Sequence, residues 1–355
     1  MPFHRLRIAD LRRETAEAVS IAFAVPDALA EHFAWTPGQY LTVRASIGGE
    51  ELRRCYSICS GLDDGELRIA VKRAACGRFS AWAHSSLRPG DTLEVMPPEG
   101  RFGAMAEPDG ARVLLGIAAG SGITPVLSIL RTALAREPRT RFVLLYGNRD
   151  SASIMFRDAL ADLKDRHLGR LAVVHVLSRE EQDVAALNGR LDAAKLALLL
   201  PSLAAPALID QAFVCGPPGL TAEAVPALQA LGVPAWRIQV ERFTAAGEPL
   251  PTPRPASPAP PPAAATATLT YDGKTTTVPM APGEAILEAG ERAGLVLPWS
   301  CRGGMCSTCR ARLTEGEVTM AQNFALEPWE LAAGFVLTCQ SHAISSHVAV
   351  DYDHV

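Results

Sequence analysis

The chain has 355 residues, and because domains usually hold roughly 100–200 residues, this length predicts two or three of them. Hydrophobic residues make up 48% of the chain and charged residues 20%, a composition typical of soluble globular proteins rather than disordered ones. Lys and Arg total 34 against 38 Asp and Glu, giving a net charge of −4, so no cationic surface for nucleic acid is expected.

Neither a membrane span nor a targeting segment is predicted. The longest apolar stretches, such as Val113–Ile117 and Leu196–Leu200, fall far short of the roughly 18–20 residues that cross a bilayer. The first residues alternate apolar and charged side chains and lack the apolar core of a signal peptide. We therefore expect a cytoplasmic protein with no membrane partner.

Residues 1–108 are predicted to form an antiparallel barrel or sandwich. Short alternating runs separated by Gly, Pro and Asp turns indicate strands in succession. The runs are Leu6–Ile8, Val19–Val25, Gln39–Ala45, Cys55–Cys59, Leu67–Lys72 and Thr92–Met96.

Residues 109–246 change to a rhythm of strand, turn and helix. The strand Val113–Ile117 precedes an apolar-periodic helix to about Leu134, and further helices are expected at Ser151–Leu163 and Leu220–Leu231. Such alternation predicts a doubly wound parallel sheet.

The segment Gly247–Ala265 contains eight Pro among nineteen residues and is predicted to be an extended linker, because Pro fixes φ and removes a backbone donor. Residues 266–355 then form a small α+β domain, with a hairpin followed by a helix at Glu284–Gly294.

Four of the eight cysteines lie in this last domain. Cys301, Cys306 and Cys309 have the spacing C-x4-C-x2-C, and Cys339 follows after twenty-nine further residues. This is the spacing of plant-type [2Fe–2S] ligands. A zinc site is the alternative, but it usually shows two C-x2-C pairs, and here only one exists. A redox dithiol would leave two cysteines unexplained, and a Rieske centre needs two His.

On these residues the domain resembles a plant-type ferredoxin from about Ala267 onward, and the resemblance implies the β-grasp fold. Gly303 and Gly304 permit a loop that curls around a cluster, because they lack a Cβ.

Two motifs in the first domain suit an anionic, flat cofactor. The first is Arg54–Ser57 on an expected strand, and the second is Gly77–Ser80 at the start of an expected helix, whose free amides and dipole favour phosphate. Taken singly, Tyr56 could equally be strand packing and Arg54 a solvated side chain.

The second domain carries a Gly-rich turn at Gly120–Pro125 after its first strand, where backbone can approach a pyrophosphate closely. Later elements are Cys215–Pro217 at a strand end and the pair Glu241 and Phe243 before the linker. Cys215 could also be a small core residue.

Together these motifs resemble those of the ferredoxin–NADP reductase superfamily, which implies FAD as the flavin. The resemblance implies that Arg54 holds flavin phosphates, Tyr56 stacks on the isoalloxazine, Ser57 bonds near N5, and Phe243 shields the flavin face. Tyr56, Ser57, Cys215 and Glu241 are the implied catalytic residues. The implied flavin pyrophosphate and nicotinamide nucleotide contacts are Gly77, Arg78, Phe79, Ser80, Gly120, Ser121, Gly122, Ile123, Thr124, Pro125, Cys215, Gly216 and Pro217.

The nucleotide preference depends on charge at the second and third strand ends. Arg149, Ser178 and Arg179 favour a 2′-phosphate and hence NADPH. Asp150 and Glu180 beside these arginines leave NADH as an alternative.

The order flavin, nicotinamide and [2Fe–2S] predicts a converter of hydride into single electrons. It resembles the reductase components of bacterial oxygenases, and among them most closely the reductases of the di-iron phenylacetyl-CoA epoxidases of phenylacetate catabolism. The implied partner is an oxygenase. Alternatives are a reductase for a steroid or carnitine oxygenase, or a redox-sensing iron–sulfur protein.

Overall fold

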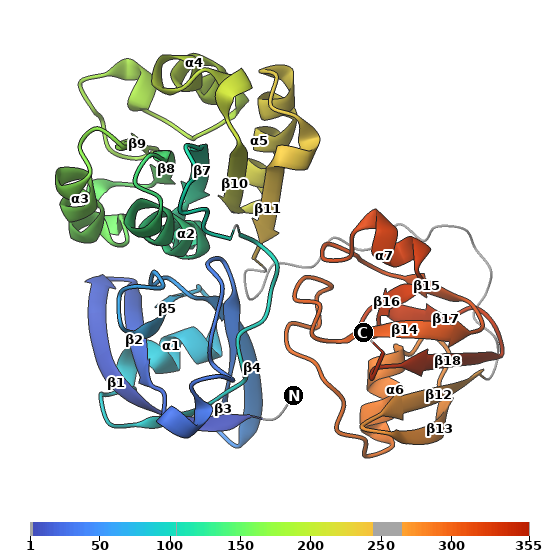
Figure 1. The fold of residues 1–355 in the computed structure, drawn as a ribbon. Helices are drawn as coiled ribbons and strands as arrows, with labels where there is room; N and C mark the ends of the chain where they lie inside the picture. Colours follow the sequence, from blue (N-terminus) through green and yellow to red (C-terminus); the bar gives the residue numbers. More distant parts are fainter. Residues whose placement is uncertain (1–2, 104, 244–264, 355) are drawn as a thin grey trace. The chain divides into compact units, whose positions relative to one another are not determined.

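A computed structural model describes residues 3–103, 105–243 and 265–354 (Figure 1). The chain divides into two compact units, each described by itself below. The first unit contains a six-stranded and a five-stranded sheet, and the second contains the C-terminal sheets. All of the predicted linker except Ala265 lies outside the described residues.

The six-stranded sheet closes into the predicted barrel. Its strands are β1 (His4–Thr15), β2 (Ala18–Ala24), β3 (Tyr40–Ile47), β4 (Glu50–Ser57), β5 (Leu67–Lys72) and β6 (Thr92–Val95). Their order is β4-β3-β6-β1-β2-β5. An antiparallel bridge from Ile58 to Ile69 joins the chain after β4 to β5, so the two ends of this order meet. Helix α1 (Arg78–Ser85) follows β5.

The five-stranded sheet is parallel, as predicted. Its strands are β7 (Val113–Ala119), β8 (Arg141–Asn148), β9 (Leu171–Leu177), β10 (Gln211–Gly216) and β11 (Ile238–Arg242). The order β11-β10-β7-β8-β9 reverses between β7 and β10. In open parallel sheets, ligands bind outside the carboxyl ends of the strands at this reversal. The turn at Gly120–Gly122 and the segment after β10 both lie there.

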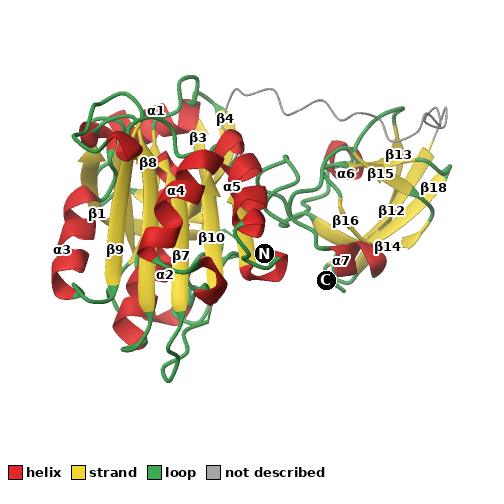
Figure 2. Cartoon of the chain, turned by 90° about the horizontal axis from the view of Figure 1, so that it is seen from above, coloured by secondary structure: helices red, strands yellow, loops and turns green. Residues whose placement is uncertain are grey.

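Helices cover both faces of the parallel sheet (Figure 2). They are α2 (Ile123–Arg136), α3 (Arg157–Arg166), α4 (Ala193–Leu203) and α5 (Pro218–Ala230). Because successive strand residues point to opposite faces, Leu114 packs in the cluster with α2 and α3, whereas Leu115 packs in the cluster with α4 and α5. This is the doubly wound arrangement that the sequence predicts.

Two helices of the parallel-sheet domain differ from the prediction. The helix expected from Ser151 begins only at Arg157, because Asp150 caps a separate 3₁₀ turn at Ser151–Ser153 and Phe156 has a left-handed φ of 59°. Helix α4 was not predicted, and it contains Pro201, a residue type that usually ends or kinks a helix. No helix in the described ranges is both long enough and apolar enough to cross a bilayer.

The C-terminal unit is a mixed five-stranded sheet with a small second sheet. Its strands are β12 (Ala265–Tyr271), β13 (Lys274–Met280), β14 (Arg310–Glu315), β15 (Val318–Met320), β16 (Phe335–Leu337), β17 (Ser341–Ala343) and β18 (His347–Asp351), and its helices are α6 (Ile286–Arg292) and α7 (Pro328–Ala332). The order is β13-β12-β18-β14-β16, with β12 and β18 parallel. The predicted hairpin is present, and the helix expected from Glu284 begins at Ile286.

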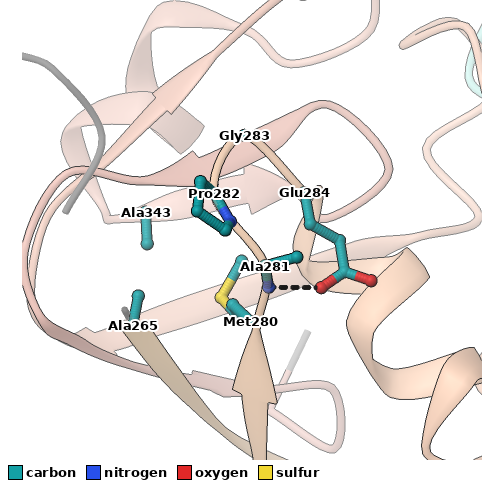
Figure 3. Close-up of a pocket in the computed structure, with 7 residues that line it drawn as sticks. All are labelled: Ala265, Met280, Ala281, Pro282, Gly283, Glu284 and Ala343. Atoms are coloured by element: carbon teal, nitrogen blue, oxygen red, sulfur yellow. Dashed lines mark hydrogen bonds between the residues drawn. The ribbon is translucent and has the colours of Figure 1, made fainter. Parts of the chain in front are cut away.

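The turn between β13 and α6 explains the later start of that helix (Figure 3). The Glu284 carboxylate accepts a hydrogen bond from the Ala281 amide at 2.7 Å and from Arg292 Nε at 2.8 Å. A small pocket lies beside this turn, lined by Ala265, Met280, Ala281, Pro282, Gly283, Glu284 and Ala343. Because Glu284 is bonded to its own turn and helix, we assign it to holding the turn.

Candidate functional site

The four predicted cluster cysteines lie in two pairs. Cys301, Cys306 and Cys309 are on the loop before β14, and Cys339 follows β16. Cys306 is hydrogen-bonded to Cys301, and Cys309 to Cys339. The pKa values of Cys301 and Cys309 are both raised. The larger cause is the hydrogen bond to the partner thiol, and the second is burial. Binding of a metal centre here must therefore release protons.

The backbone of this loop turns toward the sulfur atoms. Arg302, Gly304 and Ser307 have φ values of 53°, 73° and 57°, so the chain curls instead of continuing as a strand. The Gly303 amide donates to Cys301 Sγ at 3.3 Å, and the Cys301 amide donates to Cys306 Sγ at 3.4 Å. Amides donated to sulfur are a feature that tunes iron–sulfur clusters.

The pairing of the thiols fits a two-iron cluster better than a single metal ion. A [2Fe–2S] cluster takes two protein ligands on each iron, whereas a structural zinc needs four ligands around one ion. The donor set and its grouping therefore suit [2Fe–2S].

Three predicted catalytic residues meet between the barrel and the parallel sheet. Ser57, at the end of β4 and 3% exposed, donates from Oγ to Glu241 Oε2 at 3.2 Å. Glu241 on β11 is in register with Cys215 on β10. Burial raises the pKa of Glu241 to about 8, and the Ser57 hydrogen bond opposes this shift. The carboxyl group thus carries a proton through most of the neutral range.

Cys215 is fully buried, and burial, followed by the charge of Glu241, raises the pKa of its thiol. It packs in the core cluster of α2 and α3, and Phe243 packs against the same cluster. The thiol is therefore a neutral neighbour of the Ser57–Glu241 pair.

Among the predicted flavin residues of the barrel, Tyr56 is partly accessible, whereas Phe79 and Ser80 are buried and structural. Tyr56 is half-buried, with its ring centroid 5.7 Å from that of Phe79, which is 1% exposed and part of the barrel core. Ser80 Oγ accepts from the Ala74 amide at 3.1 Å and donates to the Gly77 carbonyl at 3.0 Å. The Phe79 and Ser80 side chains thus hold the start of α1. An anion could bind here only through the backbone amides in the first turn of this helix.

Arg54 and Arg78, the two predicted cations, lie on β4 and at the start of α1. Arg54 is half-buried and donates to the Arg53 carbonyl at 2.7 Å. Arg78 is ion-paired with Glu50 and donates to the Ile47 carbonyl at 2.8 Å. No local pattern in the sequence indicates this pairing, which ties Arg78 to the barrel.

The glycine turn has no room for a larger residue at Gly122. A Cβ there would lie 2.1 Å from the carbonyl oxygen of Cys215, so the turn after β7 touches the end of β10 through the backbone. Gly120 has a left-handed φ of 54°. Thr124 Oγ1 donates to the Ser121 carbonyl at 2.9 Å.

Some predicted residues of this turn face the core. Ile123 and Pro125 are buried, and Gly122 is buried as well, which leaves the half-buried Gly120 and Ser121 as the accessible part of the turn. Across the strand reversal, Gly216 is buried and Pro217 is exposed at the start of α5.

Two residues beside the turn were missed by sequence reasoning. The buried Tyr146 hydroxyl donates to the Gly120 carbonyl at 2.9 Å. Lys72 Nζ lies 3.3 Å from the position of a Cβ on Gly120, and burial, followed by the charge of Arg149, lowers the pKa of this lysine. Sequence reasoning could not find them, because nothing in the sequence around Tyr146 or Lys72 indicates that the side chain lies against the glycine turn.

The structure also brings the predicted basic residues together. The Ser178 amide donates to the Asn148 carbonyl at 3.0 Å, and the Arg179 amide donates to the Arg149 carbonyl at 2.7 Å. These bonds join the ends of β8 and β9. Arg149 also forms an ion pair with Glu17 of the barrel.

The acidic neighbours of these arginines have other hydrogen bonds. Asp150 accepts from the Ser153 amide at 2.8 Å, and Glu180 accepts from the Ser151 amide at 2.7 Å and from its hydroxyl at 2.9 Å. Both carboxylates therefore hold the loop after β8.

Three family models match the chain. The oxidoreductase FAD-binding domain matches residues 7–103, the oxidoreductase NAD-binding domain matches residues 117–225, and the 2Fe-2S iron-sulfur cluster binding domain matches residues 269–343. The matches fall on the barrel, the parallel sheet and the C-terminal unit in that order.

Similar proteins match this chain over nearly its whole length. One component of the 1,2-phenylacetyl-CoA epoxidase of Escherichia coli K12 is 46% identical, over 99% of this chain and 98% of that protein. The ferredoxin reductase component of the 3-ketosteroid-9-alpha-monooxygenase of Mycobacterium tuberculosis H37Rv is 38% identical, over 98% and 95%. The solved structure of phthalate dioxygenase reductase superposes with a TM-score of 0.59 at 25% identity and 98% coverage of both chains.

Proposed function

Because this chain belongs to the family of NAD(P)H-dependent oxygenase reductases that contain FAD and a [2Fe–2S] cluster, we propose that it passes electrons from NADPH to a phenylacetyl-CoA epoxidase. The observation that carries the proposal is the meeting of Ser57 with Glu241, beside Cys215, at the strand reversal of the nucleotide sheet. The identity to the epoxidase component supports the choice of oxygenase.

The proposed domain limits are 1–108 for the flavin, 109–246 for the nicotinamide nucleotide and 266–355 for the cluster. The chemistry that bound FAD would supply is the conversion of a hydride from the nicotinamide into single electrons, which the nicotinamide itself releases inefficiently. Cys301, Cys306, Cys309 and Cys339 would hold the cluster. The chain's own residues bind and orient these groups, as follows.

In the barrel, the amides of Gly77–Ser80 and the guanidinium of Arg54 bind the flavin phosphates, because a helix start and a cation both favour anions. Tyr56 supplies an aromatic face for the ring system. The Ser57 hydroxyl is held by Glu241 and so presents a fixed oxygen at the place where the two cofactors meet.

In the nucleotide domain, the backbone of Gly120–Gly122 admits the pyrophosphate, since neither glycine carries a side chain there. Gly216 and Pro217, across the reversal, border the nicotinamide. Arg149, Ser178 and Arg179 bind the 2′-phosphate. NADPH is favoured over NADH because Asp150 and Glu180, which could accept a ribose hydroxyl, already hold the adjoining loop.

A cytoplasmic location belongs to the same proposal. All eight cysteines are free thiols, which suits a reducing compartment.

The proposal is tested by reconstitution. The purified holoprotein, NADPH and the oxygenase component of a phenylacetyl-CoA epoxidase should together convert phenylacetyl-CoA, measured as product formed per NADPH consumed. The oxygenase component of a 3-ketosteroid 9α-hydroxylase serves as the comparison. Equal or better coupling to the steroid enzyme would overturn the assignment of the partner.

The nucleotide preference gives a second test. Arg179→Ala and Arg149→Ala should each lower kcat/KM for NADPH about 10- to 100-fold, because hydrogen bonds to charged groups contribute about 1.5–3 kcal/mol. The value for NADH should change little, measured by ferricyanide reduction. Arg141→Ala, at the amino end of the same β8, is the matched control. Equal losses with both nucleotides would remove these residues from the 2′-phosphate site.

A further inference from the structure

Glu330 is a buried carboxylate in the cluster domain. It lies on α7 and is 0% exposed, and its Oε1 pairs with the guanidinium of Arg310, whose side chain is 17% exposed. Removing two opposite charges from water is costly, and a buried ion pair is often no more stabilising than apolar residues of the same size. This pair therefore calls for an explanation other than stability.

Arg310 is placed by the cluster loop itself. It directly follows Cys309, and its amide donates to the Ser307 carbonyl at 2.9 Å. As the first residue of β14, it is in register with Leu337 of β16. Its guanidinium carbon lies 4.8 Å from the centroid of the Phe335 ring, so the aromatic face and the Glu330 carboxylate both hold the cation.

The second thiol pair is built on the same two strands. Cys309 immediately precedes β14, and Cys339 lies two residues beyond β16. Thr338 joins them, because its amide and its hydroxyl donate to the Cys309 carbonyl at 3.1 Å and 3.0 Å. Arg310, which carries the charge, is thus part of the same backbone that positions Cys309 and Cys339.

Glu330 is fixed from its other side by helix α7. Its Oε2 accepts from the Glu327 amide at 3.0 Å, at the start of this helix. Helix α7 has only five residues and packs against β16, and so short a helix depends on tertiary contacts. The buried carboxylate therefore serves as both the counter-charge of Arg310 and the anchor of α7.

We propose that Arg310 and Glu330 are positioning residues that set the reduction potential of the [2Fe–2S] cluster by holding a compensated charge pair beside the Cys309–Cys339 side. The inference rests on the proposed assignment of the four cysteines as ligands. Reduction adds one electron to the cluster, so an uncompensated positive charge nearby favours the reduced form and an uncompensated negative charge opposes it.

The test is an EPR-monitored redox titration of the full-length holoprotein, in which the signal of the reduced cluster is followed separately from the flavin. Glu330→Gln leaves Arg310 uncompensated and should shift the cluster potential to more positive values. Arg310→Gln leaves Glu330 uncompensated and should shift it to more negative values. Arg310→Lys retains the charge and should keep the wild-type potential.

Two exposed residues serve as controls. Glu315→Gln and Arg312→Gln, both on the same strand as Arg310, change the charge equally, but in water, where it is screened. Both should shift the potential less than the buried substitutions. Equal shifts from the controls, shifts of the same sign from both buried variants, or no shift at full iron and sulfide content would each overturn the proposal.

If the Gln variants lose the cluster, the charge-conserving variants decide whether the charge pair is the cause. Retention of iron and sulfide by Arg310→Lys and Glu330→Asp would support the charge pair, and loss of the cluster from these variants as well would overturn it. A wild-type protein with no [2Fe–2S] spectrum would contradict the proposed function itself, and would be recognised before any variant is made.

Discussion

Replacing Cys306 by Ser should abolish the [2Fe–2S] cluster and electron delivery to the oxygenase, while ferricyanide reduction by NADPH continues at close to the wild-type rate. Cys306 is 8% exposed and belongs to the first thiol pair, so its loss leaves one iron with a single cysteine ligand. The residues that we propose to serve hydride transfer, Ser57, Glu241 and the glycine turn, all lie in the other compact unit. The two activities should therefore separate.

The matched control is Cys76→Ser, which changes an exposed cysteine outside the cluster loop. It should keep both activities and the full iron content. The measurements are the visible spectrum, iron and sulfide per chain, and the two assays side by side. A parallel loss of ferricyanide reduction in Cys306→Ser would show that the flavin and nucleotide domains need the cluster domain in order to work.

The fold was predictable because each domain has its own local signal. Alternating runs with turn residues indicated the barrel strands, and the repetition of strand, turn and helix indicated the parallel sheet. The errors came where the signal was weak or misleading. Helix α4 contains Pro201, a residue type that usually breaks helices, and a left-handed Phe156 divides what was predicted as one helix.

The site was predictable as motifs but not as contacts. The cysteine spacing identified all four candidate ligands, because metal geometry restricts the spacing. The ion pairs of Arg78 with Glu50 and of Arg149 with Glu17 bring together residues distant in the sequence, and no periodicity marks such partners. Likewise, Ile123 and Phe79 belong to motifs that resemble cofactor-binding segments, yet their side chains pack in the core.

The strongest effect on the nucleotide domain is expected from Gly122→Ala. The new Cβ would lie 2.1 Å from the Cys215 carbonyl oxygen and 2.8 Å from the Gly216 amide nitrogen, and both are backbone atoms that cannot turn aside. The turn after β7 and the end of β10 must then move apart. A misplacement of about 1 Å in a site can cost about 100-fold in rate, so NADPH-driven flavin reduction, followed by stopped-flow absorbance, should fall by at least about that factor.

Gly219→Ala is the matched control, because a Cβ at this position in α5 meets nothing within 4 Å and Ala is the better helix former. It should leave flavin reduction unchanged. Reduction of the flavin and the cluster by dithionite should remain intact in both variants, since it does not use the nucleotide turn. Dithionite reduction thereby distinguishes a displaced turn from an unfolded protein. Wild-type reduction of Gly122→Ala by NADPH would show that the glycine turn need not touch the end of β10 for hydride transfer, and this turn would lose its assigned place at the nucleotide.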